Sequence, residues 1–273
     1  MNVFDQMMSR YEIKSEADKR NAIHEVMQEM ALAGLYRGGF FEKAAFYGGT
    51  CLRIFHSMPR FSEDMDFSLV TKTGSFNLQD YFPAVVAEFK ALGRDVVITR
   101  KEKSVTTNVE SAFLKDSTEI FDLAFQTERS VKVEIEVDTN PPLEFQTEQK
   151  LLLRPFSFMT RCFILPDMFA GKMSAFLFRS WKTRVKGRDW YDFEWYVRNQ
   201  VPLGFHHLQV CTRQDTGIDL SREVFMDKLK TRITSTDIEM VKRDVIPFVR
   251  DKKELDIWSH DYFLKLADLL KYE

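Results

Sequence analysis

The sequence predicts an α/β fold in its first 150 to 160 residues, followed by a helical half. Two observations lead to this division. Residues 131–138, VKVEIEVD, alternate strictly between apolar and polar side chains, which is the pattern of a strand with one buried face. From Pro166 onward the apolar pattern turns helical. We therefore expect two domains, at residues 1–160 and 161–273.

The first half is expected to alternate helices and strands. A helix is predicted over residues 15–35, because Ser15 can cap it and apolar side chains recur at helical spacing up to Gly34. Residues 105–127 fit either a helix or a hairpin, and Asn140-Pro141-Pro142 ends the strand at 131–138. The other expected elements are a strand end, a glycine turn and a short helix within 44–57, a strand over 64–70, a helix over 77–93 and a strand beginning at 96–99.

The second half is expected to be made of helices. The predicted spans are 167–182, 187–199, 221–233, 236–250 and 254–272. Pro202 and Gly204 close the second of these helices. Residues 201–273 either bind an acceptor or only complete the fold, and the pattern does not favour one of these roles.

Composition limits the classes of partner. The formal net charge is −2, so any contact with nucleic acid must come from a local basic patch and not from the global field. The three cysteines, Cys51, Cys162 and Cys211, are sparse and odd in number, which argues against a disulfide framework and for a reducing compartment. No stretch resembles a signal peptide or reaches the length of a membrane span, so we expect a cytoplasmic protein without a membrane partner.

The most informative stretch is a glycine turn followed by two aspartates. Gly48-Gly49-Thr50 follows a short apolar run, and Asp64 and Asp66 alternate with Met65 and Phe67 on a predicted strand. The two carboxylates should share one face and repel each other unless a cation neutralises them. Oxygen ligands favour Mg²⁺ or Mn²⁺, and a glycine turn with a hydroxyl suits a nucleoside triphosphate. The alternative is a turn beside two solvated aspartates.

A third carboxylate is expected from the strand at 131–138. Glu134 is the first candidate, because a two-metal site needs an acid from a neighbouring strand. Glu136 and Asp138 lie on the same face, so the choice among the three stays open. The alternative is the polar face of an edge strand.

Basic residues gather on the next two predicted helices. Lys172 and Arg179 lie seven residues apart and so share one face. Asp189 and Asp192, spaced i and i+3, can each contact a basic side chain. Cations facing an acidic metal site suit a triphosphate, whereas the alternative is a solvated basic face. The cations of this group are Lys172, Arg179, Arg184, Lys186 and Arg188.

These motifs resemble those of the AbiEii/AbiGii-type toxin nucleotidyltransferases, within the DNA polymerase β-like superfamily. The family's Gly-Gly-Ser/Thr and Asp-x-Asp correspond to Gly48-Gly49-Thr50 with Asp64 and Asp66. Its Lys-x-Asp/Gly corresponds to Lys132-Val133-Glu134, with Glu in place of Asp. The likeness extends over roughly residues 40 to 200.

The two later motifs of the family are also similar, with one change each. In Thr-x-x-Lys, Phe169 replaces Thr and Lys172 remains. In Arg-x-x-x-Lys-Asp-x-x-Asp, Arg184 and the two aspartates match, and Arg188 replaces Lys, which keeps the charge but alters its geometry.

The resemblance implies a nucleotidyltransferase-like α/β domain with a mixed sheet, followed by a helical C-terminal domain. It implies metal-dependent transfer of a nucleoside monophosphate from an NTP to a hydroxyl acceptor, with release of pyrophosphate. Toxins of this family pair with a cognate antitoxin and can act on RNA, including tRNA, so these are the implied partners beside the NTP.

The resemblance also implies a role for each site residue. Asp64 and Asp66 would hold Mg²⁺ or Mn²⁺, and Glu134 would complete the site and help activate the acceptor hydroxyl. The residues implied to contact the nucleotide are Gly48, Gly49, Thr50, Lys172, Arg179, Arg184 and Arg188. Asp189 and Asp192 would brace the basic groups.

Two other functions fit parts of the pattern. One is a catalytically inactive nucleotidyltransferase fold that binds RNA or a protein. The other is a nucleotide-sugar glycosyltransferase, although such enzymes usually carry a Rossmann-like domain before their Asp-x-Asp, and here only about 60 residues, mostly helical, precede it.

Overall fold

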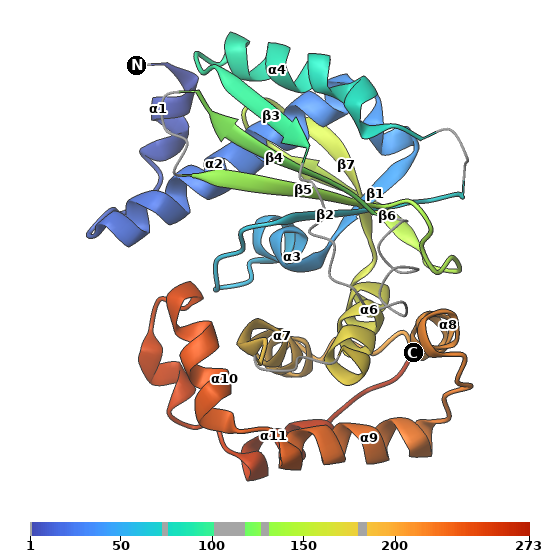
Figure 1. Cartoon of the computed structure of the whole chain (residues 1–273). Helices are drawn as coiled ribbons and strands as arrows, with labels where there is room; N and C mark the ends of the chain where they lie inside the picture. Colours follow the sequence, from blue (N-terminus) through green and yellow to red (C-terminus); the bar gives the residue numbers. More distant parts are fainter. Residues whose placement is uncertain (1, 73–75, 101–117, 127–130, 180–184) are drawn as a thin grey trace. The chain divides into compact units, whose positions relative to one another are not determined.

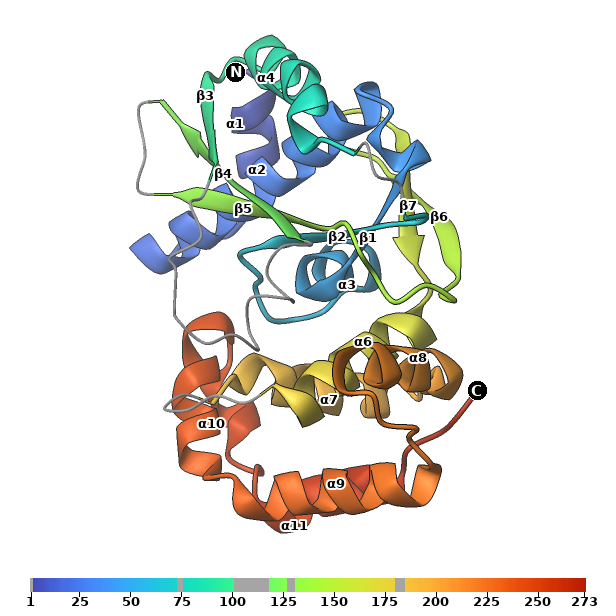
Figure 2. The same ribbon diagram turned by 45° about the vertical axis from the view of Figure 1, so that its right-hand side comes forward.

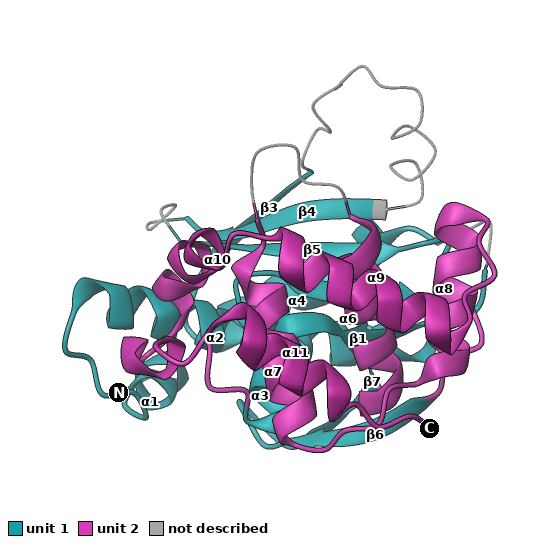
Figure 3. Cartoon of the chain, turned by 90° about the horizontal axis from the view of Figure 1, so that it is seen from below, with its two compact units in different colours: residues 1–57, 61–141, 147–162 teal, residues 58–60, 142–146, 163–273 magenta. Residues whose placement is uncertain are grey.

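A computed structural model describes residues 2–72, 76–100, 118–126, 131–179 and 185–273. The described chain forms two compact units (Figure 3). Unit 1 comprises residues 1–57, 61–141 and 147–162, and unit 2 comprises 58–60, 142–146 and 163–273. Two short segments of the first half thus belong to unit 2, and the domain boundary at residue 160 stays a prediction.

Unit 1 contains a seven-stranded mixed sheet in the order β3-β4-β5-β2-β1-β7-β6 (Figure 1). β2 pairs in parallel with β5 and β1 with β7, while β1–β2, β3–β4 and β4–β5 are antiparallel. This sheet confirms the predicted α/β fold class with a mixed sheet. The strands are β1 Ala44–Tyr47, β2 Met65–Leu69, β3 Val96–Arg100, β4 Thr118–Phe125, β5 Lys132–Asp138, β6 Thr147–Leu152 and β7 Phe158–Phe163.

Helices lie on both faces of this sheet. The helices α2 and α4 lie on one face and α3 on the other (Figures 1 and 2). The helices of unit 1 are α1 Val3–Met8, α2 Glu16–Arg37, α3 Gly48–His56 and α4 Phe82–Ala91, with 3₁₀ turns η1 Phe40–Glu42 and η2 Leu78–Tyr81.

The helix α2 is a core element. The Ser15 hydroxyl accepts a hydrogen bond from the backbone N–H of Asp18, as the sequence predicts. From Ala22 to Leu35 every residue except Glu25 is buried, which is typical of a helix enclosed on all sides. Gly34 does not end the helix, which continues to Arg37. A Cβ at Gly34 would lie 2.6 Å from the Cα of Val85 on α4. The glycine instead permits the close packing of two helices.

Unit 2 is helical, as predicted. Its helices are α6 Leu165–Phe178, α7 Gly187–Arg198, α8 Phe205–Thr216, α9 Arg222–Ser235, α10 Ile238–Val245 and α11 His260–Asp268, with 3₁₀ turns η3 Ile246–Phe248 and η4 Lys252–Leu255. Aromatic rings fill its core, where the ring of Phe169 stacks on that of Tyr196 at 4.3 Å. Phe169 is therefore a core residue at the position where the family motif has Thr. No helix in the described part of the chain is long and apolar enough to span a bilayer.

Several expectations needed correction. The strands β6 and β7 and the helix α8 were not predicted, and the helix expected over 254–272 is shorter and preceded by a 3₁₀ turn. Within the ambiguous stretch 105–127, residues 118–125 form β4, so the helical alternative is wrong there. The remaining residues of that stretch before 118 lie outside the described residues. Asp64 precedes β2 and does not belong to it.

Candidate active site

Acidic residues meet where β2 and β5 run in parallel. The strand register pairs Asp66 with Glu136, and Met65 with Ile135. Met65 and Phe67 are fully buried, so the alternation expected for β2 is confirmed and Asp66 lies on the opposite face. Asp64 immediately precedes the strand, which keeps it at the same end of β2.

The charges in this acidic cluster influence one another. The pKa of Glu136 is raised to about 9, first by burial, then by a hydrogen bond with Glu134 and by the charges of Asp66, Glu134 and Asp64. Every one of these influences raises the pKa, so the cluster holds more negative charge than its surroundings accept. Four carboxylates, and not three, form this cluster: Asp64, Asp66, Glu134 and Glu136.

Glu136 is a residue that the sequence left among three alternatives. The alternation of residues 131–138 showed which residues share a face, but only the register with β2 shows which of them faces Asp66. The third alternative, Asp138, pairs with Ser68 and accepts a hydrogen bond from the backbone N–H of Asn140 at 2.9 Å. Asp138 therefore stabilises the turn after β5.

The glycine turn lies directly against Asp66. Gly48 has a φ of +79°, and a Cβ there would lie 2.2 Å from the Oδ2 atom of Asp66. The backbone can take this path only because Gly48 has no side chain. Thr50 is fully buried, and its hydroxyl donates a hydrogen bond to the backbone carbonyl of Asp64. Thr50 thus fixes the segment that carries Asp64, and its predicted contact with phosphate stays a prediction.

The carboxylates are near one another without converging on a point. Among the described residues, no three His, Cys, Asp or Glu side chains are arranged as the ligands of one metal ion. The donor set nevertheless consists of oxygen atoms alone, which is the chemistry of magnesium and manganese sites.

A cavity of about 410 Å³ opens beside the acidic cluster in unit 1. Its walls come from α2, the segment before β2, and the strands β4 and β5. Glu134 and Asp64 belong to both the cavity wall and the cluster, whereas Asp66 and the glycine turn are not among the described residues that line it. The lining residues are Arg20, His24, Glu63, Asp64, Asp122, Lys132 and Glu134.

His24 is the buried member of this cavity wall. Its side chain is 6% exposed, and neither ring nitrogen has a hydrogen-bonding partner among the described residues. Burial lowers the pKa of His24, the Glu63 charge opposes this, and Arg20 adds to it, so the imidazole is neutral at pH 7. The sequence gave His24 no role, since a lone histidine in a helical apolar pattern carries no spacing signal.

Unit 2 holds a second charged group, a buried network of two cations and two carboxylates. Lys172 on α6 lies 2.9 Å from Asp189 Oδ1 and 2.9 Å from Asp192 Oδ2, both on α7. Arg60 forms a bidentate ion pair with Asp192, in which Nε lies 2.6 Å from Oδ1 and Nη2 lies 2.7 Å from Oδ2. Arg60 and Asp192 are 2% and 0% exposed. The i, i+3 spacing thus places both aspartates on cations, as expected from the sequence.

The network adjusts the protonation of its own members. Burial acts to raise the pKa of Asp192, but Arg60 and then Lys172 outweigh it and lower that pKa to about 2. Burial acts to lower the pKa of Lys172, but Asp189 and then Asp192 outweigh it and raise that pKa. Asp192 and Lys172 therefore stay charged at neutral pH. Arg60 is nearly fully buried, so it is a member of this network and not a surface residue.

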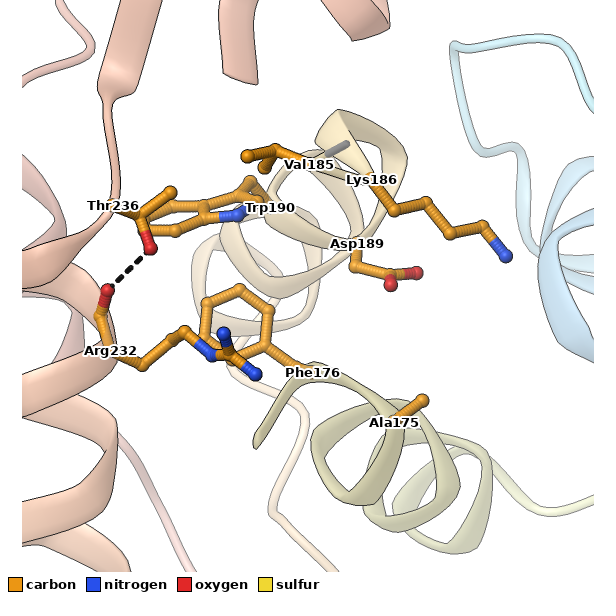
Figure 4. A pocket seen from close by; sticks show the side chains of 8 residues that line it. All are labelled: Ala175, Phe176, Val185, Lys186, Asp189, Trp190, Arg232 and Thr236. Atoms are coloured by element: carbon orange, nitrogen blue, oxygen red, sulfur yellow. Dashed lines mark hydrogen bonds between the residues drawn. The ribbon is translucent and has the colours of Figure 1, made fainter. Parts of the chain in front are cut away.

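Two of the other predicted cations, Arg179 and Arg188, contact groups outside this network. Arg179 is exposed and ends α6, and its backbone carbonyl accepts a hydrogen bond from Arg232 at 2.9 Å. The guanidinium of Arg188 lies 4.4 Å from the ring centre of Phe248. Arg184 lies outside the described residues. A small cavity of about 80 Å³ lies beside Asp189 and Trp190, and the Lys186 side chain extends away from the indole (Figure 4).

Comparison with known proteins identifies the family of this chain. The family model for "nucleotidyl transferase AbiEii toxin, type IV TA system" matches residues 31–266. The chain belongs to the AbiEii toxin family. It is accordingly a nucleotidyltransferase of a family that occurs in toxin–antitoxin systems. No curated protein sequence matches it.

Solved structures share the fold of this AbiEii-family chain. MenT4, a nucleotidyltransferase toxin of Mycobacterium tuberculosis, has a TM-score of 0.59 and 13% identity, with 97% of this chain and 93% of that chain covered. JHP933 of Helicobacter pylori has a TM-score of 0.52 and 16% identity, covering 93% and 92%. At these identities the likeness establishes the fold.

Proposed function

We propose that this AbiEii-family nucleotidyltransferase moves a nucleoside monophosphate from an NTP to a hydroxyl group of an RNA, with the help of a divalent cation. The observation that carries the proposal is the packing of the Gly48 turn against Asp66, in a cluster with Asp64, Glu134 and Glu136. A glycine backbone next to clustered carboxylates is what a triphosphate with its counter-ion requires.

The residues of the cluster fit Mg²⁺ or Mn²⁺. Asp64 and Asp66 would hold the cation together with Glu134 or Glu136, since all supply carboxylate oxygens. Burial and then the neighbouring carboxylates raise the pKa of Glu136, so the charges of the cluster repel one another. When bound, the cation would neutralise this repulsion and draw negative charge from the triphosphate. The third carboxylate is then a choice between neighbouring residues on β5, and we favour Glu136 because it is in register with Asp66.

The chain's own groups account for the transfer step. Backbone N–H groups of Gly48 and Gly49 would hold the terminal phosphates. The acceptor oxygen bonds to the α-phosphorus while the bond from this phosphorus to the bridging oxygen breaks, and pyrophosphate leaves. A carboxylate of the cluster accepts the hydroxyl proton. Lys172, Arg179, Arg184 and Arg188 remain the proposed partners of phosphate charge.

Lys172 can serve such a role without leaving its carboxylates. An ammonium group has three N–H donors. Asp189 and Asp192 each accept one of them, so a third N–H could bind a phosphate oxygen. The two aspartates would then hold the lysine in one rotamer and keep it charged. Arg60 would act through Asp192 as a positioning residue.

RNA as acceptor and a cognate antitoxin as partner rest on the family. The matching family is described as a toxin of a toxin–antitoxin system, and MenT4 is described as a nucleotidyltransferase toxin. With a net charge of −2, the chain would hold RNA through local cations. The expected cytoplasmic location agrees with an RNA substrate and stays a prediction.

The test is transfer of labelled nucleotide to total RNA. The protein is incubated with Mg²⁺ or Mn²⁺ and each α-labelled NTP in turn, beside an Asp66→Asn variant and a parallel reaction with protein extract. We expect label in RNA with the wild type alone. Label in protein would mean that the acceptor is a protein and not RNA. Metal-dependent NTP binding without transfer to RNA or protein would favour an inactive binding module.

A further inference from the structure

We propose that the 410 Å³ cavity beside the acidic cluster receives the terminal ribose of the acceptor RNA, and that His24 positions this ribose by hydrogen bonding. The inference rests on the proposed function, because it assigns a substrate to that same site. It goes beyond the function by naming where the acceptor binds and which residue outside the sequence motifs selects it.

The position of the cavity distinguishes the acceptor from the nucleotide. Asp64 and Glu134 line the cavity, so a ligand inside it reaches two of the four clustered carboxylates. The glycine turn, which would hold the triphosphate, contributes no lining residue, and neither does Asp66. The NTP and the contents of this cavity would therefore approach the cluster from different sides, as a donor and an acceptor must.

The lining chemistry favours a group rich in hydroxyls. The wall carries four carboxylates and two cations, and one of the cations, Lys132, already lies 3.5 Å from Asp122. Carboxylates only accept hydrogen bonds, so they suit the two hydroxyls of a terminal ribose and disfavour a phosphate. Arg20 is exposed on α2 and is available at the rim for the phosphodiester that follows this ribose.

His24 supplies the independent sign of a missing ligand. The residue is only 6% exposed, yet neither ring nitrogen has a partner among the described residues. Leaving a buried polar group without a hydrogen bond is unfavourable, and a ligand hydroxyl would relieve this cost. A neutral imidazole donates through one nitrogen and accepts through the other, so it can bind either side of a hydroxyl group. The volume is also within the ~300–1,000 Å³ typical of small-ligand sites.

Kinetics with matched variants test the assignment. His24→Phe removes hydrogen bonding at similar size, His24→Gln retains it, and His206→Gln alters an exposed histidine of unit 2 as a control. We expect His24→Phe to raise the KM for RNA about tenfold, the value of one hydrogen bond, with the KM for NTP unchanged. His24→Gln should recover most of this, which also separates the effect from a loss of packing.

Opposite results would overturn the assignment. If His24→Phe raises the KM for NTP and leaves the KM for RNA unchanged, the cavity binds the donor nucleotide. Equal kinetics of His24→Phe and wild type would remove His24 from substrate binding. If wild type labels no RNA at all, the proposed acceptor fails, and a binding measurement still tests the cavity.

That measurement is NMR of the histidine rings in ¹³C-histidine protein, with His24→Gln to assign the signal. Adenosine and cytidine serve as probes for a ribose, and their 2′,3′-dideoxy forms serve as controls. We expect the His24 signal to shift with the ribonucleosides alone. No shift, or an equal shift with the dideoxy forms, would overturn ribose recognition.

Discussion

Two groups of charged side chains, one in each unit, combine burial and charge with opposite results. In unit 1, burial and three neighbouring carboxylates all raise the pKa of Glu136, to about 9. In unit 2, two carboxylates meet two cations, and the pKa of Asp192 is lowered to about 2 although it is fully buried. The balanced network stabilises its own fold, whereas the acidic cluster stores a repulsion that a cationic ligand would relieve. Charge balance therefore separates a group that needs no counter-ion from one that does.

The largest effect should come from breaking the balanced network. Asp192→Asn leaves Arg60 and Lys172 buried beside a neutral side chain, so we expect a loss of about 3–5 kcal/mol in the free energy of unfolding. Urea denaturation measures this. Arg213→Ala, which breaks the exposed pair with Asp219, should cost at most about 1 kcal/mol.

A double variant separates charge from packing in that experiment. Arg60→Met with Asp192→Leu removes both members of the buried pair and should lose less stability than Asp192→Asn alone. If the double variant is as unstable as the single one, the side-chain shapes and not the charges hold this network together.

The acidic cluster should respond in the opposite manner. Asp66→Asn removes one source of repulsion, so the melting temperature should stay the same or rise, while nucleotide transfer falls by about 10²–10³-fold. Initial rates and thermal melts on the same sample check both. Retained activity would remove Asp66 from the catalytic machinery, and a large loss of stability would mean that the cluster is structural like its counterpart.

The turn at Gly48 sharpens the comparison at the level of the backbone. Gly48→Ala places a methyl group in the left-handed region and 2.2 Å from Asp66 Oδ2, so Asp66 must move. We expect a loss of stability of about 1–2 kcal/mol from the backbone alone and a clear fall in transfer rate. Gly217→Ala is the matched control, because Gly217 has a φ of +72° and no atom within 4 Å of a Cβ. It should lose similar stability and no activity.

The effect that is smallest per step of the measurement, a single pH unit, is the pH dependence of the stability of the metal-free protein. The pKa of Glu136 is higher in the folded protein than in the unfolded chain, so the folded state binds more protons between about pH 4.5 and 9. Stability should therefore fall as pH rises through that window, by at most about 1.4 kcal/mol per unit. Denaturation in EDTA at several pH values measures the slope, which Glu136→Gln should reduce. An unchanged slope would contradict the shift.

The lowered pKa of Asp192 predicts the opposite slope at acid pH, where stability should rise with pH. Its pKa is about 2 when folded, against an ordinary value of 3.8, so its contribution is present above about pH 4 and is lost as pH falls towards 2. The two regions thus give stability curves of opposite slope in separate pH windows.

The sequence by itself determined the fold class, most of the helices and the candidate residues for the chemistry. Strict alternation marked β5, and the Ser15 cap together with helical spacing marked α2, because these signals are local and depend on near neighbours alone. The pairing of Asp189 and Asp192 with cations followed from the same local geometry of one helix face.

Only the tertiary structure decided what depends on distant partners. The register of β2 with β5 chose Glu136 as the neighbour of Asp66, and packing paired the buried Arg60 with Asp192. The tertiary structure also placed His24 in the wall of a cavity. Register, burial and cavities arise from segments far apart in the chain. A periodicity in the sequence can place a side chain on a face, but the packing of other elements determines what that face meets.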